Sequence, residues 1–257
     1  ELEYCVNKVD LKCLIFATQF KSSAYAQTIL DLCPELVEQK PGHLHLKKLQ
    51  SLRVLVQISE TPIAGAYSFK EVVKKATSGY FERLDNIANG LYPDDAINIQ
   101  FTSGTTGSPK GATLSHKNII NNAVSCAKAM NLTHYDRVCI PVPLYHCFGM
   151  VLGTLACCAA GATMIYPSEG FEPDKTMHAL KSESCTAVHG VPTMFSAMLA
   201  SSEFNGKPIK SLRTGIMAGS QCPEVLMRRV LHDLGCSEIT IAYGMTETSP
   251  ISFQSDI

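Results

Sequence analysis

Segments that favour strands alternate with segments that favour helices along this chain of 257 residues, and each pair is about one strand–helix repeat long. Such alternation is typical of α/β proteins, in which helices pack on both faces of a mostly parallel sheet. We therefore expect an α/β fold with two doubly wound sheets and flanking helices. The expected strands are 13–18, 53–59, 96–101, 137–140, 162–166, 186–189, 213–217 and 239–242.

The helices are predicted from apolar periodicity and from capping residues. Ser68 and Ser115 precede helix-forming segments and are expected to be N-caps. The stretch 77–95, with two glycines and a proline, is interpreted as the most linker-like part of the chain. The residues expected on the buried face of the helix after Ser115 are Ile119, Ile120, Ala123, Ala127 and Met130. The expected helices are 22–33, 67–77, 115–130, 148–160, a segment after Pro192, and 223–234.

Composition excludes several function classes. Hydrophobic residues make up 46% of the chain, which is enough for a substantial core. The 22 basic and 23 acidic residues are well mixed and give a net charge of −1, so the chain has no basic stripe and no acidic tail. We therefore expect no nucleic-acid partner.

The eleven cysteines indicate free thiols. Their number is odd, none form a C-x-x-C pair, and Cys157 and Cys158 are adjacent within an apolar segment. A disulfide framework or a zinc ribbon would show regular, paired spacings. We therefore expect a reducing intracellular compartment and no metal bound by cysteine.

The segment 147–166 carries no charged residue and is long enough to be tested as a membrane span. Three glycines and several alanines make it only weakly lipophilic. A buried helix followed by a strand fits this segment better, so we expect no transmembrane segment. His189, at the end of a predicted core strand, is expected to have no chemical role.

One loop combines hydroxyl side chains, two glycines and a lysine directly after the predicted strand 96–101. Glycines let backbone N–H groups approach an anion, hydroxyls add donors and an ammonium offsets charge, so the loop is expected to hold a polyphosphate. A Walker A loop requires glycine before its lysine and a hydroxyl after it. Pro109 and Gly111 flank Lys110 instead, which disfavours a P-loop phosphotransferase. The loop residues are Thr102, Ser103, Gly104, Thr105, Thr106, Gly107, Ser108, Pro109 and Lys110.

A second polar motif follows the predicted strand 239–242. It offers an aromatic face, a glycine for close backbone approach, a hydroxyl and a carboxylate within five residues. Oxygen ligands of this kind suit Mg²⁺ that also binds substrate phosphates. The motif consists of Tyr243, Gly244, Met245, Thr246 and Glu247.

Together these motifs resemble those of the adenylate-forming, or AMP-binding, superfamily, which includes the acyl-CoA synthetases. The loop 102–110 resembles its phosphate loop, and 243–247 resembles its Y-G-x-T-E motif. The segment 143–149 is similar to its segment with an aromatic residue and a histidine at the acyl tunnel, and 218–220 to its glycine-rich turn beside adenine. Order and spacing agree over essentially the whole chain, which implies part of the large N-terminal lobe of such an enzyme.

The resemblance implies a role for each motif. The loop 102–110 would hold the β- and γ-phosphates of ATP. Thr246 would contact the α-phosphate and Glu247 would hold Mg²⁺, which makes these two the catalytic residues. Tyr243 would lie against adenine, with Gly244 and Met245 beside it. The adenosine and the acyl end would contact Gly219 and Ser220, and the acyl group would contact His146, Phe148 and Gly149.

The implied reaction activates a fatty acid with ATP to an acyl-adenylate and pyrophosphate, after which coenzyme A yields acyl-CoA and AMP. Among subfamilies, the chain most resembles the mitochondrial medium-chain fatty acid ligases, which implies a mitochondrial matrix location. Two alternatives stay open. One is an amino or aryl acid adenylation domain, although no acidic anchor for an amino group is evident. The other is a non-catalytic nucleotide-binding protein with the same fold.

The chain is expected to be an internal piece of a longer ligase. The family's ribose-binding aspartate, hinge and adenylation lysine lie beyond its Y-G-x-T-E motif, as does its C-terminal domain, which is expected to be absent here. We expect two α/β halves, 1–125 with the phosphate loop and 126–257 with the acyl site and the Y-G-M-T-E motif. We also expect nucleotide contacts but little turnover from this piece alone.

Overall fold

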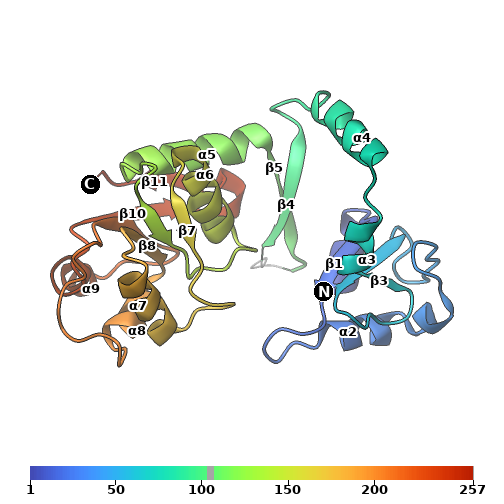
Figure 1. Ribbon diagram of the computed structural model, residues 1–257, viewed down its shortest axis with the longest axis horizontal. Helices are drawn as coiled ribbons and strands as arrows, with labels where there is room; N and C mark the ends of the chain where they lie inside the picture. The colour runs from blue at the N-terminus through green and yellow to red at the C-terminus, as the bar shows by residue number, and fades with distance from the viewer. Residues whose placement is uncertain (103–106, 257) are drawn as a thin grey trace. The chain divides into compact units, whose positions relative to one another are not determined.

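The computed structural model describes residues 1–102 and 107–256, and the chain divides into two compact units (Figure 1). The first contains Glu1–Leu91, and the second contains Tyr92–Thr102 and the chain from Lys110 onward. The boundary expected near residue 125 lies within a helix of the second unit. The division of the chain into halves at that point stays a prediction.

The first unit is built on a parallel three-stranded sheet in the order β1-β2-β3. Helix α2 and the turn η1 bury Ile29 and Leu36 against Phe16 and Leu55 of the sheet. The strands are β1 (Cys13–Ala17), β2 (Val54–Ile58) and β3 (Ala66–Ser68). The helices are α1 (Leu2–Lys8), α2 (Tyr25–Leu32), η1 (Pro34–Glu38), α3 (Phe69–Lys74) and α4 (Ser78–Ala88).

The second unit contains a six-stranded sheet in the order β11-β10-β9-β8-β6-β7. All neighbours pair in parallel except β11, which is antiparallel to β10. The carboxyl ends of the parallel strands therefore meet at one edge, where α/β sheets bind their ligands. The strands are β6 (Arg137–Cys139), β7 (Thr163–Ile165), β8 (Ala187–Gly190), β9 (Thr214–Ala218), β10 (Glu238–Gly244) and β11 (Ile251–Gln254).

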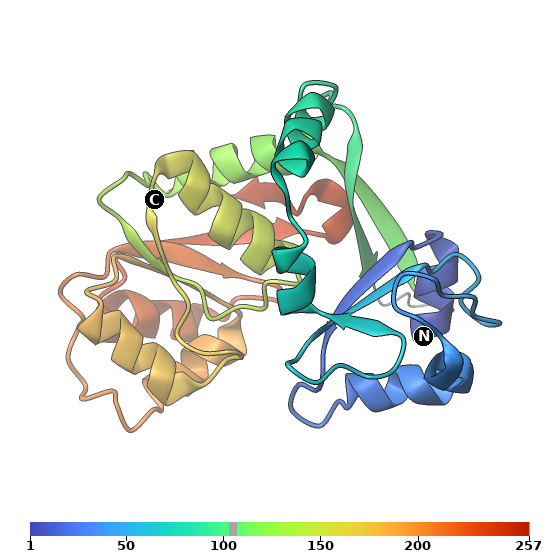
Figure 2. The ribbon, with the colours of Figure 1, turned by 45° about the vertical axis from the view of Figure 1, so that its right-hand side comes forward.

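Helices cover both faces of this sheet, as expected for a doubly wound fold. Adjacent strand residues such as Ile216 and Met217 belong to different hydrophobic clusters, because successive side chains point to opposite faces. Both views show α5 and α6 on one side and α7 and α9 on the other (Figures 1 and 2). The helices are α5 (His116–Ala129), η2 (Phe148–Leu155), α6 (Ala156–Ala160), α7 (Pro173–Ser182), α8 (Pro192–Leu199), α9 (Glu224–Arg229), η3 (Val230–Leu234) and η4 (Thr246–Thr248).

A separate antiparallel hairpin of β4 (Ala96–Thr102) and β5 (Lys110–Ser115) precedes α5. The sequence predicts β4 but not β5, since none of the expected strands lies between the polar loop and the helix expected from Ser115. In β5, Ala112 and Leu114 are buried while Lys110 and Thr113 are exposed, which is the alternation of a half-buried strand. The loop 102–110 therefore joins two paired strands rather than a strand and a helix.

Both predicted helix caps are confirmed. The Ser68 hydroxyl accepts a hydrogen bond from the Glu71 amide, and Glu71 bonds back to the amide of Ser68. Ser115 and Asn118 form the same reciprocal pair at the start of α5. One helix-face expectation is wrong: Ile120 is 44% exposed, because it lies about 100° from Ile119 around the helix axis, at the margin of the buried face.

The apolar segment after Cys147 is confirmed as a buried helix followed by strand β7. Its first part, η2, has π-helical geometry, and its second part, α6, ends at Gly161 in the left-handed conformation. Within residues 1–102 and 107–256, no helix combines the length and the apolar character needed to cross a bilayer. The eleven cysteines all fall within these ranges, and each is a free thiol.

His189 is buried in β8, as its sequence context predicts. Its Nε2 lies 3.0 Å from the carbonyl oxygen of Leu152, and its ring stacks on Phe148. Burial lowers the pKa of His189 to about 4, because the imidazolium cannot be solvated there. The imidazole is therefore neutral and donates from Nε2.

This histidine should make the protein less stable in mild acid. Between the unfolded pKa near 6.5 and the folded pKa, only the unfolded chain takes up the proton, so the free energy of unfolding falls as the pH falls. We expect His189 to account for a loss of about 2 kcal/mol between about pH 7 and pH 5. Urea titrations of the protein and of His189→Gln at both pH values measure the free energy of unfolding. Between the two pH values this free energy should fall by about 2 kcal/mol less in the variant than in the parent. Equal losses in the two proteins would contradict the prediction.

Candidate functional site

The Y-G-M-T-E motif and the glycine-rich turn lie at the same edge of the six-stranded sheet. Gly219 and Ser220 follow directly after β9, which ends at Ala218. Tyr243 and Gly244 are the last residues of β10, the parallel neighbour of β9. The structure therefore brings together two segments that are more than twenty residues apart in sequence.

The side chains of the Y-G-M-T-E motif differ in their exposure to solvent. The Tyr243 ring is 63% exposed and Glu247 is also exposed, whereas Thr246 is 8% exposed. A Cβ atom on Gly244 would lie 1.8 Å from the carbonyl oxygen of Pro250. Only glycine fits there, so the close approach of these two backbone segments explains the glycine of the motif.

A short turn holds Thr246 and Glu247. The Thr248 hydroxyl accepts a hydrogen bond from the Met245 amide at 3.1 Å and lies 2.9 Å from the Met245 carbonyl oxygen. The Thr248 amide also bonds to the Met245 carbonyl, at 2.9 Å. These contacts close the turn η4 and leave the Glu247 carboxylate directed away from the core.

The segment 143–149 forms a tight turn between β6 and η2. A Cβ atom on Gly149 would lie 2.3 Å from the carbonyl oxygen of Pro143, so this glycine lets the turn close. The exposed His146 accepts a hydrogen bond at Nδ1 from the Phe148 amide at 3.1 Å, and partial desolvation lowers the pKa of His146. Phe148 is 6% exposed and packs in the hydrophobic core. Of the predicted acyl contacts, His146 is therefore accessible and Phe148 is not.

Cys147 connects three of the predicted motifs. Its thiol donates to Oε1 of Gln100, which precedes Thr102 by two residues in β4. Burial raises the pKa of Cys147, and the hydroxyl of Thr246 beside it partly offsets this rise. The sequence predicts no role for Gln100 or for Cys147, because a contact between distant segments leaves no local pattern.

The phosphate loop is described in part. Thr102 and Lys110 are paired across the β4–β5 hairpin, so the two ends of the loop are neighbours. Lys110 is exposed, and β5 packs against the turn η4. Gly107 and Ser108 are exposed and Pro109 is half-buried. The residues predicted to bind phosphate that lie outside the described ranges are Ser103, Gly104, Thr105 and Thr106.

The groups at this edge fit a hydrated Mg²⁺ ion that binds phosphates. Mg²⁺ prefers oxygen ligands and is usually held by one or two carboxylates together with substrate phosphates and water. Glu247 supplies an exposed carboxylate, and no basic side chain forms an ion pair with it in the part of the chain that the structure describes. Thr246 adds a hydroxyl next to it. This donor set matches the expected ligand type.

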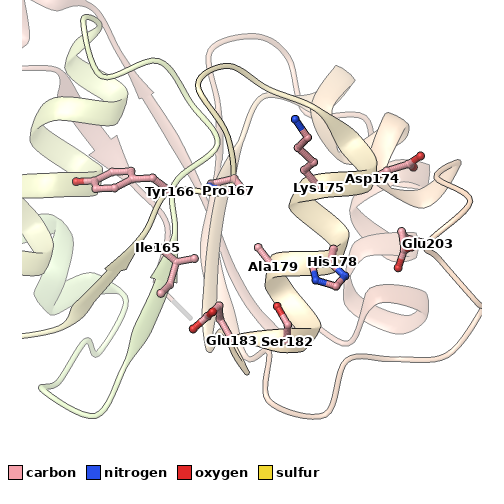
Figure 3. A pocket seen from close by; sticks show the side chains of 10 residues that line it. All are labelled: Ile165, Tyr166, Pro167, Asp174, Lys175, His178, Ala179, Ser182, Glu183 and Glu203. Carbon is pink, nitrogen blue, oxygen red and sulfur yellow. The ribbon is translucent and has the colours of Figure 1, made fainter.

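A cavity of about 480 Å³ lies elsewhere, beside β7 and α7 (Figure 3). Its charged groups are compensated by nearby partners: Lys175 binds Glu172 at 2.9 Å, and Glu203 binds Lys181 at 2.6 Å. Lys175 also extends away from His178 (Figure 3). These pairings indicate a solvated surface hollow rather than a second site.

Comparison with known proteins identifies the class. The sequence pattern of the AMP-binding enzyme family matches residues 1–256, and the chain belongs to this family. YngI of Bacillus subtilis (strain 168), which carries the provisional name acyl-CoA synthetase, is 44% identical over 99% of this chain and 46% of its own length. The mitochondrial medium-chain acyl-CoA ligase ACSF2 of Danio rerio is 40% identical over 98% of this chain and 42% of its own length. The chain thus spans less than half the length of these relatives.

Solved structures agree on the fold. The anthranilate CoA ligase AuaEII in complex with anthranoyl-AMP matches all of this chain and 45% of its own, with a TM-score of 0.77 and 22% identity. An ATP-bound RpMatB-BxBclM chimera matches all of this chain with a TM-score of 0.71 and 20% identity. The solved structures confirm the predicted α/β fold. The family match confirms the predicted relation to adenylate-forming enzymes, acyl-CoA synthetases among them.

Proposed function

We propose that this chain carries the ATP site and part of the acyl site of a fatty acid–CoA ligase. The observation that supports the proposal most is the arrangement at the sheet edge, where the Glu247 carboxylate, the Thr246 hydroxyl and the hairpin that bears Lys110 lie in one unit. The similarity to proteins named acyl-CoA synthetases and ligases supports the type of reaction.

The proposed reaction has two displacements. A carboxylate oxygen of the fatty acid forms a bond to the α-phosphorus of ATP, and the bond from that phosphorus to the bridging oxygen of the β-phosphate breaks, which releases pyrophosphate. The thiol sulfur of coenzyme A then forms a bond to the acyl carbon and releases its proton to solvent, while the bond from that carbon to the phosphate oxygen breaks and AMP leaves. Both steps depend on positioning and on neutralising the charge of the phosphates.

The residues of this chain would bind and orient these groups. Thr246 would donate to the α-phosphate, and Glu247 would hold Mg²⁺, which would neutralise phosphate charge. Tyr243 has an exposed ring face that suits stacking on adenine. His146 would border the acyl site from an accessible position. The loop from Thr102 to Lys110 would contact the β- and γ-phosphates, and Gly244 and Met245 would contact the nucleotide. Gly219 and Ser220 would contact adenosine and the acyl end. Phe148 and Gly149 would support the acyl site.

We also propose a medium-chain fatty acid as the substrate and the mitochondrial matrix as the location. Both rest on the relatives named mitochondrial medium-chain acyl-CoA ligase, which are 37–40% identical to this chain. The division into halves 1–125 and 126–257 of a longer lobe, completed by a C-terminal domain, belongs to the same proposal.

An acid panel tests the function. The full-length protein is incubated with ATP, Mg²⁺ and coenzyme A and with octanoate, palmitate, benzoate or leucine in turn, and mass spectrometry detects acyl-CoA and AMP. The proposal expects octanoyl-CoA as the main product and none without Mg²⁺. Preference for benzoate or leucine would support an aryl or amino acid adenylating enzyme instead. ATP binding without product from any acid would support the non-catalytic alternative.

A further inference from the structure

Asn122 of α5 binds the chain immediately after the Y-G-M-T-E turn. Its Oδ1 accepts a hydrogen bond from the Ile251 amide at 3.1 Å, and its Nδ2 donates to the Ile251 carbonyl at 2.9 Å. One side chain thus satisfies both backbone groups of one residue, as a neighbouring antiparallel strand would. Since β11 is the edge strand of its sheet, Asn122 takes the place of a further strand at this point.

These bonds act on both ends of the segment that carries Thr246 and Glu247. Ile251 pairs with Gly244, which precedes the turn. Nδ2 of Asn122 also lies 3.4 Å from the carbonyl oxygen of Thr248, the residue that closes the turn. A single amide group therefore contacts the residue that closes the turn and the residue that pairs with Gly244 before it.

The same helix begins at the phosphate-loop hairpin. Ser115 ends β5 and caps α5, and Asn118 completes the cap with a hydrogen bond of 2.9 Å from the Ser115 amide. Asn122 lies four residues later and thus on the same face of the helix. Strand β5 of the hairpin, which starts at Lys110, and the turn that bears Glu247 are therefore joined through one helix.

The junction between α5 and the turn has a polar side open to water. The helix face and the turn enclose an open hollow of about 320 Å³ with polar walls. Asn122 itself is half-buried, so its hydrogen bonds are only partly shielded from water. The residues around the hollow are Lys117, Asn118, Asn121, Asn122, Ser125, Thr248 and Ser249. The hydrogen bonds of Asn122 thus hold the turn against α5, beside the packing of Ile251 on the core cluster that includes Ile119 and Ala123 of this helix.

We propose that Asn122 is a positioning residue that holds Thr246 and Glu247 in register with the phosphate-loop hairpin. The catalytic part of this inference rests on the proposed function. Asn122 touches no substrate itself; it acts through the backbone of Thr248 and Ile251. Partners that orient a metal-binding group in this way typically change metal affinity or activity by about 10- to 100-fold when removed.

The test compares Asn122→Ala and Asn122→Asp with the matched control Asn121→Ala. Asn121 is the exposed neighbour of the same residue type on the same helix. The aspartate variant keeps a carboxylate oxygen that can accept from the Ile251 amide, but it loses the NH₂ group that donates to the Ile251 carbonyl. The full-length protein is used, with two measurements: amide hydrogen exchange of the peptide 243–252 without ATP or Mg²⁺, and ATP–pyrophosphate exchange as a function of Mg²⁺ and fatty acid.

We expect Asn122→Ala to speed amide exchange in 245–251 about tenfold or more, since the turn loses its anchor. The adenylation rate should fall about 10- to 100-fold and the Mg²⁺ concentration for half-maximal rate should rise, with the KM of the fatty acid changing less than about twofold. Asn122→Asp should give intermediate values, and Asn121→Ala should match the parent. A purely structural role would not raise the Mg²⁺ requirement.

Several results would overturn the proposal. One is a folded Asn122→Ala protein whose amide exchange, rate and Mg²⁺ dependence stay within about twofold of the parent. If Asn122→Ala does not fold, unchanged values in Asn122→Asp overturn it equally. If the parent adenylates no acid, the proposed function fails, and amide exchange alone then decides whether Asn122 holds the turn.

Discussion

Replacing Glu247 with glutamine is expected to lower the rate of acyl-adenylate formation about 100- to 1000-fold, the size of effect seen when one preorganised charge-stabilising group is removed. Glutamine keeps the size of the side chain and loses its charge, so Mg²⁺ would lose the carboxylate proposed to hold it. Because Glu247 is exposed and forms no ion pair among the described residues, the protein should fold as before. ATP–pyrophosphate exchange at saturating fatty acid measures the rate.

Glu224→Gln is the matched control for this substitution. Glu224 is an exposed carboxylate of α9 whose one ion pair among the described residues is with Arg228 on the surface of the same helix. Its neutralisation should leave the exchange rate unchanged. A folded Glu247→Gln protein with a rate within about threefold of the parent would show that another group holds the metal.

Asp136→Ala is expected to destabilise the protein by about 2–3 kcal/mol, the cost of losing hydrogen bonds to a charged group that is buried. Asp136 is 4% exposed and lies directly before β6. The Arg213 guanidinium donates to both carboxylate oxygens at 2.9 and 3.0 Å, and the Thr186 hydroxyl donates at 2.7 Å. The alanine variant would remove one of the two carboxylates that bind the arginine.

The network links the amino ends of four neighbouring strands. Arg213 also donates to Glu238 at 2.8 Å and to the carbonyl of Asn131 at 2.8 Å. Burial would raise the pKa of Asp136, but hydrogen bonds from Thr186 and Arg213 outweigh it and the pKa is lowered. Since the folded pKa lies below the unfolded value, this stabilisation is present at neutral pH and is lost only when the pH falls below about 4.

Urea unfolding followed by circular dichroism measures the loss, because the midpoint reports the free energy of unfolding. Glu224→Ala, which breaks only an exposed pair, should leave the midpoint almost unchanged. A loss below about 1 kcal/mol for Asp136→Ala would mean that the network contributes no more than a surface pair does.

Most of the sheet could be predicted from the sequence because its strands are short apolar segments next to turn residues. Segment 213–217, for example, differs by one residue at each end from β9. Other elements carry weaker local patterns. Helix α4 contains Gly79 in its first turn and is followed by Gly90 and Pro93, which favour a linker. In α7, charged residues alternate with Met177 and Leu180, and only the tertiary structure shows that these two are buried.

The residues of the candidate site also differ in how well the sequence predicts them. Its motifs are contiguous, so residue type and spacing locate Tyr243 to Glu247 directly. The side chains that connect the motifs are single residues in unremarkable contexts. Gln100 lies in a strand, Cys147 in a turn and Asn122 on a helix, and only folding brings each to its partner. The return of the chain as β5 was also missed, because a polar loop does not determine the direction of the segment that follows.

The most direct test of the central claim is calorimetric binding of a non-hydrolysable octanoyl-adenylate analogue to this chain in the presence of Mg²⁺. The account predicts binding in the micromolar range, a Kd of about 1 to 100 μM. It also predicts weaker binding to Tyr243→Ala, which removes the aromatic ring proposed to stack on adenine. Absence of binding by a chain shown to be folded by circular dichroism would contradict the claim that these residues form an acyl-adenylate site.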